Sequence, residues 1–492
     1  MTRLSTSVLS QLEGVKRPSY DRSQLKPRIV HLGIGAFHRA HQAYYTEELL
    51  NLEGGDWGIV GCSLRSPTVK EQLEPQDGLY TLFVKGEQSS AQVIGAVQRV
   101  LVGPEDPSAV VDAIANESVK IVSLTVTEKG YCHNPATGEL NFDHPDIVHD
   151  LFNLDKPKTA VGFIVAGLKK RHETGLPPIS ILSCDNLPDN GQVVKRVVCD
   201  FAERVSISLA SWVKNEVNFP GTMIDRIVPA TTENDIHELA QNAGYEDKAM
   251  VCAEPFSQWV IEDNFSNDRP AWEKVGATFV KDVAAYETMK LRLLNGSHSL
   301  LAYVGYLSGY ETIYNCMQDD ELVELTQAFM HTASKSLKMP EGFSVLDYQQ
   351  QLIDRFSNPG LLHRTWQIAM DGSQKVPQRW LNTMRDLLAA DESVDIFCLA
   401  LAAWMRYCLG RDEDGGPIEL SDPLAEQLKD IAVDNRGQWR SYVDGFFAVS
   451  DVFEGDFASQ QALVDKCAQY LEQVYSEGMQ NTFAEFVASS KR

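Results

Sequence analysis

The chain has 492 residues, of which 43% are hydrophobic and 23% are charged. Its 44 Lys and Arg against 68 Asp and Glu give a formal net charge of −24 at pH 7. This balance argues against nucleic acids and anionic membranes as partners, because proteins that bind them present a concentrated basic face. The length allows two large domains or three smaller ones.

Compartment and membrane signals point to a cytoplasmic protein. The nine cysteines are scattered without a CxxC pair, which is typical of reduced thiols. The N-terminus has no continuous apolar stretch of the kind found in a signal peptide. The most apolar segment, residues 396–405, is too short to cross a bilayer and predicts a buried helix.

The first 280 residues alternate short apolar runs with helical patterns. This alternation predicts an α/β domain of the Rossmann type, with a doubly wound parallel sheet and helices on both faces. The expected strands cover residues 29–32, 57–64, 119–126 and 179–184, and the expected helices cover residues 40–52 and 159–172.

The pattern changes near residue 280. Long periodic segments replace the short β-branched runs, so we expect residues 281–492 to form a mostly α-helical domain after a dinucleotide-binding domain of residues 1–280. The expected helices cover residues 286–307, 320–337, 378–390, 394–409 and 459–476.

A glycine-rich turn lies where the first expected strand meets the first helix, at HLGIGAFHRAH, residues 31–41. Glycines there allow a tight turn and a close approach to a pyrophosphate, which would face the helix N-terminus. Gly33, Gly35 and Phe37 are therefore candidate cofactor contacts. The motif is incomplete because His38 occupies the third glycine position, and an ordinary strand-to-helix turn is the alternative.

The end of the second expected strand bears on the choice between NAD and NADP. The acidic residue typical of NAD enzymes is missing there, and Arg65 with Lys70 could meet a 2′-phosphate, so NADP is not excluded. His38 and His41, three residues apart, have no carboxylate or cysteine cluster at a zinc spacing, so we interpret them as helix-surface histidines and expect no metal.

Residues 183–188, SCDNLP, follow the last expected strand, at the edge where open α/β sheets bind ligands. Asn186 could donate an amide hydrogen bond to a reacting oxygen. A simple turn is the alternative interpretation.

The segment around Lys290, Asn295 and His298 carries candidate proton-transfer groups. At about 100° per residue the three fall within about 140° of one helix face. A lysine among apolar side chains has a lowered pKa and can act as a general base, while asparagine and histidine can hydrogen-bond a reacting oxygen. The alternative is a surface lysine, a capping asparagine and a satisfied histidine.

Basic residues gather in a later segment, where Arg364 and Arg379 flank the sequence DGSQK, which ends at Lys375. Such groups would suit an anionic substrate if they converge on a pocket. A polar loop before a helix is the alternative.

Taken together, these segments resemble the polyol-specific long-chain dehydrogenases, the mannitol dehydrogenase family. The resemblance spans essentially the whole chain and implies a Rossmann-type domain, a helical domain, a nicotinamide cofactor and, usually, a monomer. It rests on the Lys290, Asn295 and His298 arrangement and on GIGAFHRAHQ (33–42), TVTEKGY (125–131), SCDNLPDNG (183–191) and FPGTMIDRIVP (219–229).

Within that family the loop HRTWQIAMDGSQKVPQRW, residues 363–380, is most similar to that of the fructuronate reductases, also called D-mannonate oxidoreductases. Mannitol 2-dehydrogenases carry an arginine eight residues before the lysine of this loop, where this chain has Gln367. The expected reaction therefore interconverts D-fructuronate and D-mannonate. The alternatives are a mannitol 2-dehydrogenase or related polyol dehydrogenase, and a cofactor-binding sensor.

The resemblance also implies roles for individual residues. Lys290 would be the general acid/base, Asn186 and Asn295 would stabilise the alkoxide-like oxygen, and His298 would orient it. Lys375, with Arg364 or Arg379, is expected to hold the sugar-acid carboxylate. Three carboxylates complete the expected site: Asp225 on substrate hydroxyls, and Glu128 and Glu287 as a proton relay.

Overall fold

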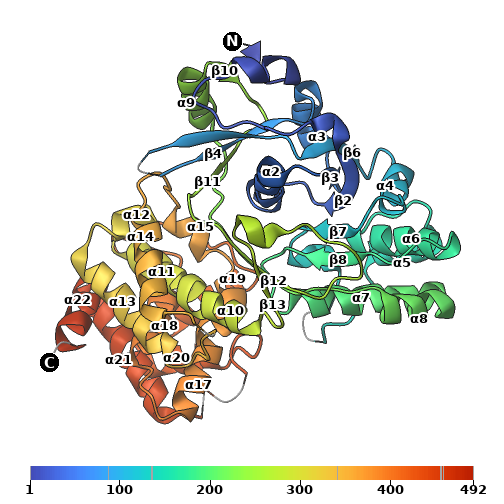
Figure 1. The fold of residues 1–492 in the computed structure, drawn as a ribbon. Helices are drawn as coiled ribbons and strands as arrows, with labels where there is room; N and C mark the ends of the chain where they lie inside the picture. Colours follow the sequence, from blue (N-terminus) through green and yellow to red (C-terminus); the bar gives the residue numbers. More distant parts are fainter. Residues whose placement is uncertain are drawn as a thin grey trace. The chain divides into compact units, whose positions relative to one another are not determined.

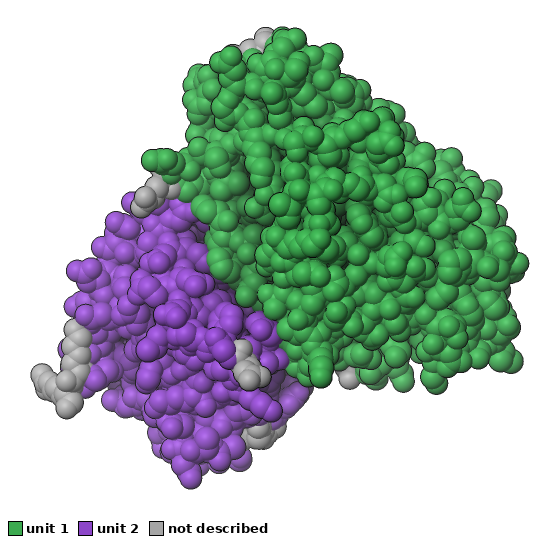
Figure 2. Space-filling view, viewed as in Figure 1, with its two compact units in different colours: residues 1–284 green, residues 285–492 purple. Residues whose placement is uncertain are grey.

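The structure is a computed structural model that describes residues 2–86, 88–134, 137–340, 342–454, 457 and 459–490. The chain divides into two compact units, residues 1–284 and residues 285–492 (Figure 2). Each unit contains its own clusters of buried apolar side chains. The two are described separately below.

The centre of the first unit is a five-stranded parallel sheet (Figure 1). Its strand order is β6-β3-β2-β7-β8, so the chain builds outward from β2 in one direction and then in the other. This order confirms the predicted Rossmann-type sheet and places its topological switch point between β2 and β7. The strands are β2 (Lys26–Leu32), β3 (Trp57–Ser63), β6 (Val97–Val102), β7 (Ile121–Leu124) and β8 (Ser180–Ser183).

Both faces of this sheet are buried, because successive side chains of a strand point to opposite sides. Val30 and Leu32 of β2 belong to one apolar cluster, and Ile29 belongs to another. The helices that contribute to the first cluster are α4 (Pro107–Ile114), α6 (Ala160–Glu173), α7 (Asn190–Val205) and α8 (Ile207–Glu216). Of these, α6, α7 and α8 pack against one another (Figure 1). The second cluster includes α1 (Ala36–Ala40) and α2 (Gln42–Glu53).

Several short strands of the first unit were not predicted. They contain only two to five residues each, too few for a clear alternation of apolar and polar positions. They form the sheets β13-β12-β9, β11-β4-β5 and β1-β10. Their bounds are β1 (Thr2–Arg3), β4 (Tyr80–Val84), β5 (Ser90–Ile94), β9 (Thr222–Asp225), β10 (Tyr245–Glu246), β11 (Val251–Ala253), β12 (Gln258–Glu262) and β13 (Thr278–Val280).

Short helices complete the first unit. They are the α-helices α3 (Thr68–Leu73), α5 (Pro145–Phe152) and α9 (Glu233–Ala243) and the 3-10 helices η1 (Thr6–Gln11), η2 (Arg22–Gln24), η3 (Glu74–Gln76), η4 (Glu128–Tyr131) and η5 (Trp272–Val275).

The described part of the second unit is helical, as predicted. Its elements are α10 (Ala284–Met289), η6 (Lys290–Asn295), α11 (Gly296–Leu307), α12 (Ile313–Cys316), α13 (Asp320–Ser334), α14 (Val345–Phe356), α15 (Thr365–Ala369), α16 (Gly372–Val376), η7 (Pro377–Leu381), α17 (Asn382–Ala389), α18 (Asp395–Tyr407), α19 (Ala425–Asp434), α20 (Trp439–Phe447), α21 (Gln461–Glu477) and α22 (Met479–Ser490). Helix α18 packs against α11 and α21 and is buried from Ile396 to Tyr407, which confirms the predicted buried helix (Figure 1). Among the described residues, none of the helices is both long and apolar enough to cross a membrane.

Two segments of the second unit are π-helical, η6 and η7. The sequence predicted continuous α-helices at both places, with 3.6 residues per turn, and that geometry was wrong there. A π-turn bonds residue i to residue i+5 and is often found at functional sites. Segments η6 and η7 pack against each other, so the two irregular turns lie together within this unit.

Candidate active site

The glycine turn after β2 is tightly enclosed. Gly33 has φ +93°, and a β-carbon on it would lie 2.1 Å from the Thr125 carbonyl oxygen at the end of β7. Its N–H donates to the Cys62 carbonyl of β3 at 2.8 Å. Gly35 caps the N-terminus of α1, and a β-carbon there would face open space except for the Gly33 carbonyl at 3.9 Å. The turn therefore leaves room directly above a helix N-terminus, at the switch point of the sheet.

A groove of about 530 Å³ opens beside this turn. Its charged lining includes Arg65, Lys129 and Lys158 but only one carboxylate, Asp146, so it is basic in a strongly acidic protein. Its remaining lining residues are Gly33, Ile34, Gly35, Ser63, Leu64, Val69, Thr125, Val126, Thr127, Gly130, Cys132, His144, Thr159 and Ala160. A glycine turn and a basic groove of this size fit a dinucleotide. Phe37 lies on α1, where its ring stacks on that of His41 with centroids 5.2 Å apart.

The interpretation of His38 and His41 as helix-surface histidines was wrong, because both are fully buried. The His38 ring stacks on His31 of β2 with centroids 3.4 Å apart, so an imidazole fills the position of the third glycine. Burial lowers the pKa of His38 to about 3, which keeps the ring neutral. The His41 Nε2 lies 2.9 Å from the Gln258 carbonyl oxygen of β12, to which it donates.

Hydrogen bonds from the His31 ring connect the turn to β7. The Thr125 hydroxyl donates to the Gly33 carbonyl at 2.9 Å, so it must accept from His31 Nε2, also at 2.9 Å. His31 Nδ1 then accepts from the Ser123 hydroxyl at 2.8 Å. The buried histidines therefore hold together the ends of the two strands that flank the switch point.

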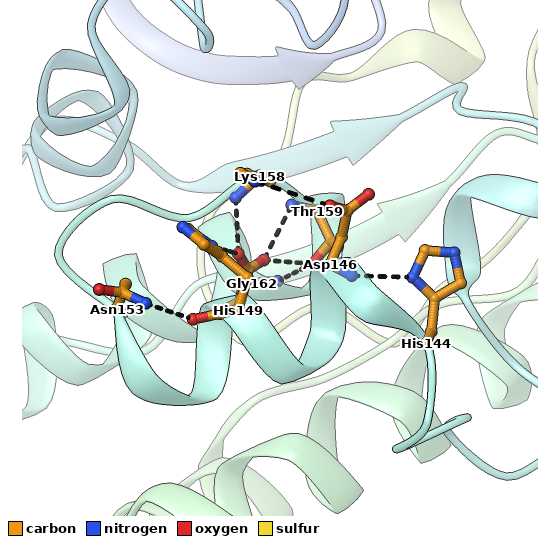
Figure 3. A network of polar contacts seen from close by, with 8 residues as sticks. His144, Asp146, His149, Asn153, Lys158, Thr159 and Gly162 are labelled. Carbon is orange, nitrogen blue, oxygen red and sulfur yellow. Dashed lines mark hydrogen bonds and ion pairs between the residues drawn. The ribbon is translucent and has the colours of Figure 1, made fainter.

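The N-terminus of α6 forms another wall of the groove. The buried carboxylate of Asp150 accepts from the backbone N–H groups of Lys158 and Thr159, both at 2.8 Å, and from the Thr159 hydroxyl at 2.7 Å. The Thr159 hydroxyl also accepts from the Gly162 N–H at 2.9 Å. Figure 3 shows these contacts at Lys158, Thr159 and Gly162. It also shows the N–H of Asp146 donating to the Nδ1 atom of His144.

Three sequence-predicted residues of the first unit follow or end strands. Asn186 is exposed just after β8, and Glu128 is exposed at the start of η4, after β7. Asp225 is buried at the end of β9, opposite Gln258 in the register of β12. Strands β7, β8 and β9 all belong to the first unit, so the positions of these three residues are set within that unit. Glu287 lies in the second unit, on α10.

Lys290 and Asn295 are the first and last residues of η6, and each is 8% exposed. The two residues are five apart, which is the separation that the backbone hydrogen bonds of a π-helix relate. His298 follows on α11.

A cluster of basic side chains surrounds His298. Its ring stacks on Phe356, with centroids 5.2 Å apart, and lies edge-on to His363 at 5.1 Å. Burial, reinforced by His363 and the cations of Arg379, Arg355 and Lys375, holds the pKa of His298 well below its usual value. Burial likewise lowers the pKa of His363 to about 4. His298 is therefore neutral at pH 7.

Lys375 lies on α16 and Arg379 lies on the following segment, η7. The Lys375 ammonium donates to the carbonyls of Ile368 at 3.1 Å and Met370 at 2.5 Å, and burial next to Arg379 lowers its pKa to about 8. Arg379 donates to the Asn295 carbonyl at 3.2 Å and to the Ser299 hydroxyl at 2.8 Å.

Arg364, the other candidate for binding a carboxylate, forms an ion pair with Glu311. Its side chain is 40% exposed, and it is not among the charged groups that lower the pKa of His298. Arg355, which the sequence analysis missed, is one of those groups and is 7% exposed on α14. The only signal for Arg355 in the sequence is the amphipathic pattern of α14, in which this charged residue occupies a position on the buried face.

Among the described residues, no group of three or more His, Cys, Asp or Glu side chains is arranged to hold a metal ion. The cysteines of the sequence are free thiols.

Comparison with known proteins places both units. Residues 27–274 match the mannitol dehydrogenase Rossmann domain, and residues 282–475 match the mannitol dehydrogenase C-terminal domain. The chain is 45% identical to the uncharacterised oxidoreductase YeiQ of Escherichia coli, over 94% of this chain and 95% of the relative. It is 44% identical to the D-mannonate oxidoreductase of the same organism, over 97% and 99%. The solved mannitol 2-dehydrogenase of Pseudomonas fluorescens, a ternary complex with NAD and D-mannitol, is 37% identical with a TM-score of 0.89, over 99% and 100%.

Proposed function

Because the chain belongs to the mannitol dehydrogenase family of oxidoreductases, which act on CH–OH groups, we propose that it interconverts D-fructuronate and D-mannonate. The reaction transfers a hydride between a nicotinamide cofactor and a secondary alcohol. We choose a sugar acid as the substrate because positively charged side chains lie near His298.

The observation that supports the choice of a sugar acid is a group of three cations, Arg355, Lys375 and Arg379, which lie near enough to His298 to lower its pKa. An excess of positive charge attracts an anion, and lysine and arginine form charge-assisted hydrogen bonds with a carboxylate. Neutral polyols offer no such charge, whereas the carboxylate of a uronate does. Arg379 and Lys375 are the proposed carboxylate ligands, with Arg355 in support, and Arg364, which is paired with Glu311, is not assigned to the carboxylate.

We assign residues 1–280 to cofactor binding and residues 281–492 to substrate binding and catalysis. Gly33 and Gly35 would hold the pyrophosphate, with Phe37 beneath the turn and Arg65 at the adenosine ribose. NAD is the proposed cofactor, as in the related mannitol 2-dehydrogenase, and it would supply the hydride acceptor for the oxidation. NADP stays open, because Arg65 rather than a carboxylate lies at this end of the groove.

Lys290, buried in η6, takes the hydroxyl proton during oxidation and returns it during reduction. Asn295 and Asn186 donate hydrogen bonds to the oxygen as it gains charge, and neutral His298 orients the same oxygen. Asp225 binds substrate hydroxyls. Glu128 and Glu287 carry the proton between Lys290 and solvent.

The proposal is tested by following NADH and NADPH oxidation with D-fructuronate and D-fructose as parallel substrates. We expect a clear preference for D-fructuronate in kcat/KM. The Lys375→Met variant should raise the KM for D-fructuronate by about tenfold, because a charge-assisted hydrogen bond is lost, and leave the KM for D-fructose unchanged.

Arg364→Met provides the matched control, since its cation is paired with Glu311 outside the cluster. It should change neither KM appreciably. Preference of the wild-type enzyme for D-fructose would contradict the sugar-acid assignment and favour a mannitol 2-dehydrogenase, the activity named for the solved relative.

A further inference from the structure

We propose that Asp185 is a positioning residue, whose buried carboxylate holds the loop after β7 in the conformation from which Glu128 and Asn186 act. This inference rests on the proposed function, because it concerns the roles given there to these two residues. Asp185 itself is 8% exposed and lies two residues after the end of β8.

The carboxylate of Asp185 connects two strand ends through three donors. One oxygen accepts from the Val126 N–H at 2.9 Å and from the Tyr131 hydroxyl at 2.7 Å. The other accepts from the Thr127 N–H at 2.8 Å. Burial raises the pKa of Asp185, and these three donors oppose that shift. A single side chain thus fixes both ends of the segment that contains Glu128.

The backbone held by this carboxylate is strained. Thr127 has φ +64° and ψ 164°, a region that is populated almost only by glycine. For a β-branched residue this is a marked outlier. Without the two adjacent N–H contacts, Thr127 would relax toward negative φ and turn the following residue, Glu128, in another direction. Strain of this kind is held at functional sites by the surrounding structure.

The segment around Asp185 is itself held to β9. The Asn190 amide donates to the Asp185 carbonyl at 3.1 Å and to the Thr222 carbonyl at 2.9 Å, and its oxygen accepts from the Thr222 N–H at 3.0 Å. Gly191 lies so close to Gly221 that a β-carbon on it would be 2.8 Å from the Gly221 Cα. The ends of β7, β8 and β9, and with them Glu128, Asn186 and Asp225, are therefore held by Asp185 and Asn190.

Asp150 offers a control of matched chemistry in the same unit. It is also a buried carboxylate that accepts from two consecutive backbone N–H groups and one hydroxyl, at the N-terminus of α6 (Figure 3). Asp150 holds Lys158 and Thr159, which have no proposed part in proton transfer. Loss of either carboxylate leaves buried N–H groups unpaired and should lower stability comparably.

The experiment compares Asp185→Asn and Asp150→Asn in the full-length protein, with thermal unfolding and steady-state kinetics at saturating cofactor. An asparagine cannot accept from both N–H groups, because one of its two atoms is itself a donor. We expect Asp185→Asn to lower kcat by at least about tenfold, as small misplacements of reacting groups do. Asp150→Asn should lose similar stability and raise the KM for the cofactor, because Lys158 and Thr159 line the proposed cofactor groove, while kcat at saturating cofactor stays near the wild-type value.

A second variant keeps the test informative if Asp185→Asn folds poorly. Glycine adopts the conformation of Thr127 without strain, so in a Thr127→Gly background the loss of kcat from Asp185→Asn should shrink to less than about threefold. Wild-type kcat in folded Asp185→Asn, or an equal loss in Asp150→Asn, would overturn the proposal. The ratio of variant to wild type is measured on whichever sugar the wild-type enzyme reduces, so failure of the proposed substrate is seen separately in the wild-type assay.

Discussion

At the scale of single residues, burial decides which charged groups can carry chemistry. Lys375 is one of several lysines in the sequence, but in the fold its side chain is partly buried and is influenced by the cation of Arg379. Both effects favour the neutral amine, and the pKa falls to about 8. The charge of this side chain is therefore sensitive to small changes of pH in the physiological range.

This pKa predicts a pH dependence that distinguishes a charged from a neutral substrate. Below pH 8 Lys375 is an ammonium and can bind a carboxylate, and above pH 8 it becomes an amine. We expect the KM for D-fructuronate to rise by up to about tenfold between pH 7 and pH 9.5, as the charge-assisted bond is lost. Initial-rate measurements across this range, with D-fructose as the reference substrate, provide the test. A parallel rise for both sugars would contradict the role of Lys375.

At the scale of elements, the glycine turn and the π-helical segments show how local geometry is adapted to the site. Gly33 must be glycine because of its φ and because of the Thr125 carbonyl that lies against it. The third glycine of the motif is replaced by His38, which stacks on His31 and preserves close packing of α1 on β2. In the second unit, Lys290 and Asn295 are the first and last residues of the π-helical segment η6.

The buried His38 predicts a loss of stability in acid. Its folded-state pKa is about 3, whereas an unfolded histidine has a pKa near its usual 6.5. As the pH falls below 6.5 the unfolded state takes up a proton that the folded state excludes, so the free energy of unfolding decreases until about pH 3. Between pH 6.5 and pH 5, His38 alone accounts for about 2 kcal/mol of this decrease.

A His38→Asn variant should therefore lose less stability on acidification than the wild type. Its unfolding free energy at pH 7 is expected to be lower, because the stack on His31 is removed, but its decrease toward pH 5 should be about 2 kcal/mol smaller. Urea unfolding at several pH values measures both quantities. His237→Asn, a change on the exposed side of α9, is the control, and identical slopes for all three proteins would disprove the assignment.

At the scale of the whole molecule, each unit has its own apolar core. One cluster fills the helical unit, and separate clusters fill the two faces of the central sheet in the other. Units with independent cores can unfold separately. The proposed cofactor groove is lined by residues of the first unit alone.

Cofactor binding should therefore stabilise one unit more than the other. We expect two transitions in scanning calorimetry, with NAD shifting mainly the transition of residues 1–284. At a concentration 100 times its Kd, a ligand adds about 2.7 kcal/mol to the stability of the state that binds it. Limited proteolysis with mass spectrometry assigns each transition to a unit. A single transition, shifted as a whole by NAD, would show that the two units unfold together.

Much of the fold could be predicted because it depends on local patterns. Apolar runs with glycine punctuation located strands of the parallel sheet, and helical periodicity located α18 and α21 to within a few residues. The short strands β9 to β13 were missed, because two to five residues carry no readable period. Their contribution is nevertheless large at the site, since β9 carries Asp225 and is tied by Asn190 to the loop that carries Asn186.

The sequence by itself determined the identity and spacing of the groups that can do chemistry: the glycine turn, the Lys290, Asn295 and His298 series, and the DGSQK loop. These follow from properties of residues close together in the chain. Only the tertiary structure decided that Arg355 joins the cluster around His298, that Arg364 pairs with Glu311, and that Asp185 holds Thr127 in a strained conformation. Burial and pairing arise between residues far apart in sequence, so local patterns alone did not identify these partners.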